Sequence, residues 1–173
     1  MPSSVRYVAV IGKGDRCPPL VRALAVEVGH QLAQLHPWVV LVCGGLGGVM
    51  DGAALGMTEA GGVAIGLIPA GHTPSAHLTY AIRLGLPVLF RDITTAMAAD
   101  LMVVLPGSHG TAIEGWAGAE RHLPLVGVGD HTRFASGTLP FSALAEPDEL
   151  PGLVGDLLRL EVDRADQSAD RVR

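Results

Sequence analysis

Short runs of apolar residues alternate along the chain with longer segments whose apolar positions recur at the spacing of a helix. The apolar runs show little polar alternation, as expected for strands that are buried on both faces of a sheet. We predict strands at Arg6–Gly12, Trp38–Cys43, Gly62–Ile68, Leu101–Leu105 and Pro124–Val128, with a further short strand at Pro87–Phe90.

Helices are predicted between these strands. Pro18 and Pro19 open the first helix, which runs to about Leu35, because proline is favoured in the first turn of a helix. Its expected buried face is formed by Leu20, Leu24, Val28 and Leu32. Further helices are expected at Gly48–Ala60, Arg91–Ala98, Gly110–His122 and Asp148–Leu160, and a loop at Pro69–Gly85.

This alternation predicts an α/β fold, a Rossmann-like three-layer α/β/α sandwich around a mostly parallel sheet. A chain of 173 residues is long enough for one domain. We assign residues 1–160 to a single Rossmann-like nucleotide-binding domain, and residues 161–173 to a charged C-terminal tail that we expect to be disordered. Ligands of such sheets bind where the carboxyl ends of strands meet the starts of helices.

The composition excludes several classes of function. The net charge of −5 argues against a nucleic-acid-binding surface. No apolar run reaches 18 residues and no signal peptide is evident, so we expect no membrane partner. Cys17 and Cys43 do not make a disulfide framework, which favours a cytoplasmic location.

The histidines are scattered without the spacing of metal ligands, so no metal site is predicted. The methionines Met50, Met57 and Met97 are expected in the core.

A glycine-rich turn of one design follows two of the predicted strands. The first contains Gly44, Gly45, Gly47 and Gly48, and the second contains Gly107, Ser108, His109, Gly110 and Thr111. An acid stands at the same offset in each, Asp51 in the first and Glu114 in the second. Such turns let the free N–H groups of the following helix face an anion, although many are plain connections. For Asp51 we favour a simple charge–dipole role.

The second turn resembles a known motif. Residues Pro106–Glu114, P-G-S-H-G-T-A-I-E, are similar to the P-G-G-x-G-T-x-x-E motif of the LOG (Lonely Guy) family, also labelled lysine decarboxylase-like, with Arg91 at the spacing of the family's arginine. The run Cys43–Pro69 is more similar to a sister group, the short bacterial DprA-related proteins that include molybdenum cofactor carriers. Ser108 and Asp92, which follows Arg91, depart from the LOG pattern.

The resemblance implies a phosphoribohydrolase that cleaves the N-glycosidic bond of a nucleoside 5′-monophosphate. It implies Arg91 and Glu114 as catalytic residues and the glycines, Ser108, His109 and Thr111 of the two turns as phosphate or ligand contacts. The alternative is a carrier that binds a phosphorylated pterin or a nucleotide without chemistry. No cofactor is implied, and the expected partners are the small-molecule ligand and further copies of the chain in a homodimer or homotetramer. A pyridoxal-phosphate decarboxylase is excluded because Lys13, the single lysine, has no such pocket around it.

Overall fold

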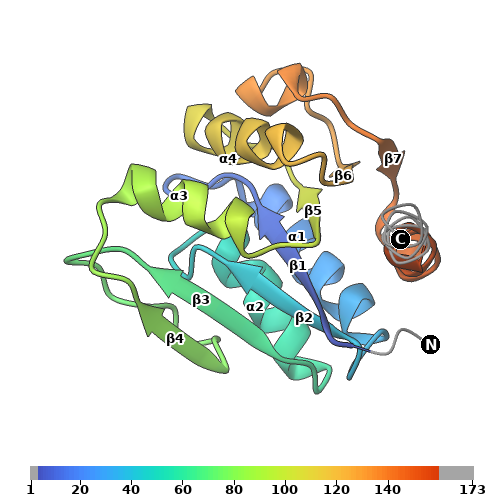
Figure 1. The fold of residues 1–173 in the computed structure, drawn as a ribbon, viewed down its shortest axis with the longest axis horizontal. Helices are drawn as coiled ribbons and strands as arrows, with labels where there is room; N and C mark the ends of the chain where they lie inside the picture. The colour runs from blue at the N-terminus through green and yellow to red at the C-terminus, as the bar shows by residue number, and fades with distance from the viewer. Residues whose placement is uncertain (1–3, 160–173) are drawn as a thin grey trace, which may run out of the picture.

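The computed structural model describes residues 4–159 and contains a seven-stranded sheet between two layers of helices (Figure 1). All neighbouring strands are parallel, in the order β4-β3-β2-β1-β5-β6-β7. The strands are β1 (Arg6–Ile11), β2 (Val39–Cys43), β3 (Ala64–Ile68), β4 (Tyr80–Arg83), β5 (Leu101–Val104), β6 (Leu125–Val128) and β7 (Ala143–Ala145). The predicted fold class is confirmed.

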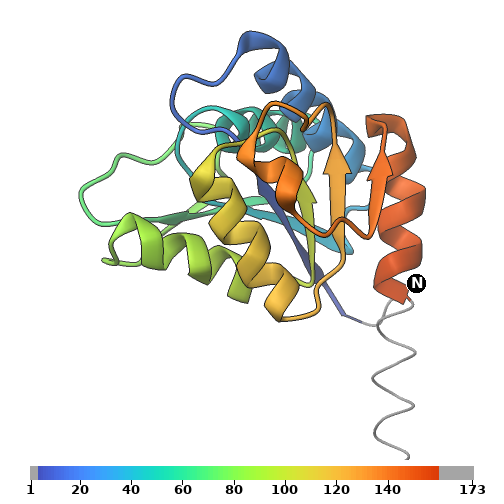
Figure 2. The same ribbon diagram turned by 90° about the horizontal axis from the view of Figure 1, so that it is seen from above.

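The helices cover the sheet on both faces (Figure 2). They are α1 (Pro19–Ala33), α2 (Val49–Glu59), α3 (Val88–Met97) and α4 (His109–Glu120), with short 3₁₀ turns η1 (Ala135–Thr138) and η2 (Pro147–Glu149) and a helical segment at 150–159. Helices α1 and α2 and the segment 150–159 pack on one face, and α3 and α4 pack on the other. Within residues 4–159, no helix has the length and apolar character needed to cross a membrane.

Each strand of the sheet's centre contributes to two separate cores. In β1, Val8 and Val10 face α1 and α2, whereas Ala9 and Ile11 face α3 and α4. The side chains of a strand alternate between the two faces, so a strand covered on both sides must be apolar throughout. This explains why the central strands were recognisable from the sequence as uninterrupted apolar runs.

The edge of the sheet differs from prediction. The segment expected as the loop Pro69–Gly85 contains the edge strand β4, all of whose residues are exposed. The prediction of a strand at Pro87–Phe90 is wrong, because helix α3 begins at Val88, directly after the proline. Proline fixes a backbone angle that suits the residue before a helix, and here Pro87 is the N-cap of α3.

Two further predictions, of the last strand and of the buried face of α1, also differ from the structure. Strand β7 follows the strand that was expected to be the last, and its three residues give too short a run for detection. Leu20, placed on the buried face of α1 by the periodicity, is 85% exposed, while Val28 and Leu32 on the same face are fully buried. The expected tail at 161–173 lies outside the described residues.

The order of the strands reverses between β1 and β5. From β1 the chain adds β2, β3 and β4 on one side and then crosses to add β5, β6 and β7 on the other. The loops that leave β1 and β5 therefore diverge, which opens a crevice at the carboxyl ends of these strands, the usual ligand site of such sheets.

Candidate functional site

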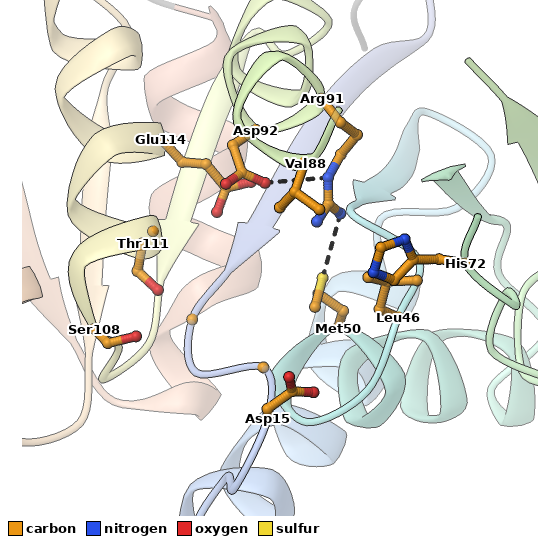
Figure 3. A pocket seen from close by; sticks show the side chains of 13 residues that line it. Asp15, Leu46, Met50, His72, Val88, Arg91, Asp92, Ser108, Thr111 and Glu114 are labelled. Carbon is orange, nitrogen blue, oxygen red and sulfur yellow. Dashed lines mark hydrogen bonds and ion pairs between the residues drawn. The ribbon is translucent and has the colours of Figure 1, made fainter. Parts of the chain in front are cut away.

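A cavity of about 230 Å³ lies at this reversal of strand order (Figure 3). The loop after β1 forms one wall, and the residues just before and just after the start of α2 form a second. Helix α3 and the first turns of α4 complete it. The side chains facing the cavity are Asp15, Leu46, Met50, His72, Val88, Arg91, Asp92, Ser108, Thr111 and Glu114, with Gly12, Gly14 and Gly110 between them.

One end of the cavity is formed by the N-terminus of α4. The backbone N–H groups of His109, Gly110 and Thr111 make no hydrogen bond to a described residue, and the N-cap Ser108 makes no side-chain cap. The first N–H groups of a helix need partners from outside it and carry the positive end of the helix dipole. This end of the cavity is therefore suited to an anion such as a phosphate.

The centre of the cavity holds three buried charged side chains. Arg91 of α3 is 3% exposed, and both Asp92 and Glu114 are 8% exposed. The Arg91 Nε atom lies 3.1 Å from Asp92 Oδ1, and its Nη1 atom lies 3.7 Å from Met50 Sδ (Figure 3). The Nε–H group nevertheless has no hydrogen bond of good geometry among the described residues. The guanidinium thus keeps donors for a ligand.

The two acids at the centre resist ionisation. The pKa of Glu114 is raised to about 8, mainly by burial. The negative charge of Asp92 adds to this rise, and the positive charge of Arg91 opposes it. Burial also raises the pKa of Asp92, against the lowering effect of Arg91. At neutral pH the Glu114 carboxyl is therefore mostly protonated. A carboxylic acid kept neutral in this way can donate a proton to a ligand.

Glu114 should make the stability of the protein depend on pH. Its pKa is 4.5 when unfolded and about 8 when folded, so between these values only the folded state keeps the proton. The free energy of unfolding should fall as pH rises through this range, by up to about 1.4 kcal/mol per pH unit. We expect Glu114→Gln to lose this slope, measured by denaturant unfolding at several pH values between 5 and 8. Glu120→Gln, at the exposed end of the same helix, is the control; a slope that persists in Glu114→Gln contradicts the assignment.

The first glycine turn has a different place from the second. None of its four glycines lines the cavity, although Leu46 between them does. Gly44 packs closely against Arg91, since a Cβ atom added to Gly44 would lie 1.5 Å from Arg91 Nη1. Gly45 and Gly48 have positive φ angles of 68° and 66° and approach the β3 side of the core and the backbone of the β1 loop, respectively. Gly44, Gly45 and Gly48 thus pack against Arg91 and the rest of the chain, and this turn reaches the cavity through Leu46.

The helix after the first turn also differs from α4 at its start. The Val49 N–H group donates to the Lys13 carbonyl at 2.9 Å, so one of the N–H groups at the start of α2 already has a hydrogen-bond partner within the chain. Asp51 accepts hydrogen bonds from Arg22 and from Ser75 Oγ, the latter at 2.7 Å, and so joins α1, α2 and the loop before β4. Despite the matching pattern of the two turns, an open N-terminus facing the cavity belongs to α4.

Among the residues predicted for the site, Arg91, Ser108, Gly110, Thr111 and Glu114 come together around the cavity. The Gly107 N–H group donates to Ser136 Oγ, and the side chain of His109 is exposed, outside the cavity lining.

Sequence reasoning missed five side chains at the cavity, the apolar Leu46 and Val88 and the more polar or polarisable Asp15, Met50 and His72. Met50 packs against the core, as expected, and also contacts Arg91. Met97 is 51% exposed, so of the three methionines only Met57 is fully buried. His72 comes from the loop before β4, far along the chain from either motif. The position of Asp15 directly after β1 was the available signal. Among the described residues, no group of three or more His, Cys, Asp or Glu is placed to hold a metal ion.

Comparison with known proteins assigns the family. The model of the SLOG cluster4 family matches residues 5–144 of the chain. The chain belongs to the SLOG cluster4 family. The resemblance to the LOG-related superfamily that the motifs carried is thereby confirmed. An uncharacterized protein of Archaeoglobus fulgidus is 29% identical over 110 residues, which are 62% of this SLOG chain and 69% of the relative.

Two solved structures similar to this SLOG protein have described ligands. The molybdenum cofactor carrier protein of Chlamydomonas reinhardtii is 26% identical, with a TM-score of 0.75 over 90% of this chain and 99% of its own. The molybdenum cofactor binding protein of Rippkaea orientalis is 23% identical, with a TM-score of 0.78 over 91% and 99%. The second likeness shows the fold alone, and both extend over nearly the whole of the described chain.

Proposed function

We propose that the protein binds a nucleoside 5′-monophosphate and hydrolyses its N-glycosidic bond, releasing the free base and ribose 5-phosphate. The observation that carries the proposal is the buried carboxyl of Glu114, whose pKa burial raises to about 8, in the same cavity as the Arg91 guanidinium and one helical turn from the open N-terminus of α4. A phosphate at that N-terminus places the sugar of the nucleotide toward the centre of the cavity, where these two side chains lie.

The chemistry of the bond fits this arrangement. As the bond between C1′ and the base nitrogen breaks, the base gains electrons and the ribose becomes positive. The Glu114 carboxyl gives its proton to the departing base, and the carboxylate that results faces the ribose cation and stabilises it. The carboxylate then takes a proton from the water that attacks C1′, which returns Glu114 to its starting state. The net reaction adds one water molecule across the bond.

Arg91 provides a fixed positive charge in this scheme. Its guanidinium is held by Asp92 on one side and by the Gly44 backbone on the other. A guanidinium that retains free N–H donors binds a phosphate oxygen or a carbonyl of the base by charge-assisted hydrogen bonds. Asp92 reduces the net charge around Arg91, so we expect binding of the phosphate to depend mainly on α4.

A second proposed function is that of a carrier for a phosphorylated pterin such as the molybdenum cofactor. The observation that favours it is the similarity to the Chlamydomonas reinhardtii carrier over 90% of the chain. The open N-terminus of α4 would hold the phosphate of the pterin in the same way. Under this proposal Glu114 and Arg91 bind the ligand and no bond is broken. Both functions suit the cytoplasm, where the free thiols of Cys17 and Cys43 remain reduced.

One experiment separates the two functions. The purified protein is incubated with AMP, GMP, CMP and isopentenyladenosine monophosphate, and free base is followed by chromatography. Release of a base from any of them supports the hydrolase. A protein that releases none but yields a fluorescent pterin on heat denaturation supports the carrier, and the hydrolase proposal is then wrong.

We also propose that the protein forms a homodimer through the outer face of α3 and α4. The two helices pack side by side (Figure 1) and expose six large apolar side chains outside the cavity lining, each between 36% and 58% exposed. They are Leu89, Phe90, Ile93, Met97, Ile113 and Trp116. A patch of this kind suits a stable interface, which buries roughly 800 Å² on each partner.

The dimer is tested by changing the charge of this face. We expect light scattering to show a dimer for the wild type and a monomer for Phe90→Glu and Trp116→Glu, because a buried unpaired carboxylate opposes association. Leu20→Glu is the matched control, since Leu20 is an exposed leucine on the opposite face. A monomeric wild type, or dimers in both glutamate variants, contradicts the proposal.

A further inference from the structure

The turn before α4 is held from behind by a buried serine. The Gly107 N–H group donates to Ser136 Oγ at 3.1 Å, and the Ser136 N–H group donates to the Gly107 carbonyl at 3.1 Å. Ser136 belongs to η1, is fully buried, and is not among the residues that line the cavity. The reciprocal pair ties η1 to the first residue of the glycine turn.

The same turn is fixed from its other side by the loop after β1. The Pro106 carbonyl accepts a hydrogen bond from the Lys13 N–H group at 3.0 Å. The Pro106 carbonyl and the Gly107 N–H group belong to one planar peptide unit, so the two hydrogen bonds together determine how this plane is turned. The chain enters α4 directly from this plane. Its orientation therefore sets the direction of the free N–H groups at the N-terminus of α4.

A histidine completes the arrangement. His131 Nδ1 lies 2.8 Å from Ser136 Oγ. While its oxygen accepts from Gly107, the Ser136 hydroxyl can donate its own hydrogen to Nδ1. This direction of the hydrogen bond requires a neutral ring that carries its proton on Nε2. The ring is 8% exposed, packs against Phe141 at 4.9 Å between centroids, and has a pKa that burial lowers. The buried Nε2 atom makes no hydrogen bond to a described residue, although nearby carbonyls of Val128 and Val104 favour a proton on the ring.

We propose that Ser136 and His131 are positioning residues for the phosphate end of the cavity. They act through Gly107 and touch no ligand themselves. His131 orients the Ser136 hydroxyl, and Ser136 orients the peptide that leads into α4, so that the N–H groups of His109, Gly110 and Thr111 point into the cavity. The inference rests on the proposed phosphate site, whichever reaction follows there.

The test compares a ligand that carries the phosphate with one that lacks it. In Ser136→Ala and in His131→Phe, we expect AMP to bind roughly fivefold to tenfold more weakly and adenosine to change by less than about twofold. Ser142→Ala is the matched control, because Ser142 makes the same reciprocal pair with Leu125, with its Oγ atom accepting at 3.2 Å, at the start of β6. Equal weakening of both ligands, or none, overturns the proposal, since a general loss of structure does not discriminate between them.

A second readout needs no ligand. Nitrogen shifts of the His131 ring report its tautomer, and we expect a proton on Nε2 in the wild type. We also expect each variant to shift the amide resonances of Gly110 and Thr111, while Ser142→Ala leaves them unchanged. A proton on Nδ1, or shifts confined to Gly107 and η1, overturns the proposal. If the wild type binds no AMP, the phosphate site is wrong, and these amide shifts still decide whether the pair positions α4.

Discussion

Replacing Glu114 by glutamine should reduce hydrolysis of AMP by roughly 10²- to 10⁴-fold, the range of a lost general acid. Glutamine has the shape of the protonated carboxyl but cannot release its proton at the departing base. Because the wild-type side chain is already mostly neutral below its pKa of about 8, binding of AMP should change little. The loss is therefore expected in kcat, measured by chromatography of the free base, and only weakly in KM.

The pH dependence of the wild type supplies a second view of the same group. The rate should fall as pH rises through about 8, because the Glu114 carboxyl then loses the proton that it donates. Glu120→Gln, on the exposed end of α4, should retain the full rate and the same profile. Undiminished release of base by Glu114→Gln would show that another group carries the proton.

Replacing Gly44 by valine should weaken both binding and turnover, although Gly44 does not line the cavity. A Cβ atom at this position would lie 1.5 Å from Arg91 Nη1 and 2.6 Å from Met50 Sδ, so the guanidinium must leave its place. Loss of hydrogen bonds from a charged donor corresponds to roughly a 10- to 100-fold fall in kcat/KM. The measurement is the kcat/KM for AMP of the variant against the wild type.

The first turn supplies its own control for this effect. Gly47→Ala adds its Cβ atom in open space, with no atom within 4 Å. We expect it to behave as the wild type, which separates displacement of Arg91 from a general sensitivity of the turn. A similar loss in both variants contradicts the assignment of Arg91, as does full activity in Gly44→Val.

The central sheet could be predicted from the sequence because the burial of each strand is visible in the strand's own residues. Strands buried on both faces, such as β1 and β5, must be apolar throughout and are followed by helix starts. The edge strand β4 gave no such signal, since none of its residues is buried and it lies in a segment rich in loop residues. The extent of α3 was missed for a related reason, because Val88, Leu89 and Phe90 resemble a short strand and are exposed rather than buried in a helical stripe.

Site residues could be predicted where one sequence motif contains them. They could not be predicted where the fold brings them together from separate segments. Ser108, Thr111 and Glu114 lie within one turn and helix, so their spacing alone implies a common position. Arg91 came from its spacing in a family resemblance. His72 reaches the cavity from another loop with no local pattern to mark it, and Asp15 is marked only by its place in the loop after β1.

The same distinction explains the first glycine turn. Its pattern matches that of the second turn, yet packing against Arg91, β3 and the β1 loop accounts for Gly44, Gly45 and Gly48, respectively. A glycine is required equally by close contact of the backbone with a ligand and by close contact with the rest of the chain. Sequence cannot distinguish these two demands.

In the proposed complex, the phosphate of a nucleoside 5′-monophosphate lies at the N-terminus of α4 and its glycosidic bond lies at Glu114. A crystal structure of Glu114→Gln with AMP tests this arrangement. We expect phosphate oxygens within hydrogen-bonding distance of the N–H groups of His109, Gly110 and Thr111, and the bond between C1′ and adenine beside residue 114 and Arg91. A phosphate bound elsewhere, or a sugar turned away from residue 114, would contradict the account.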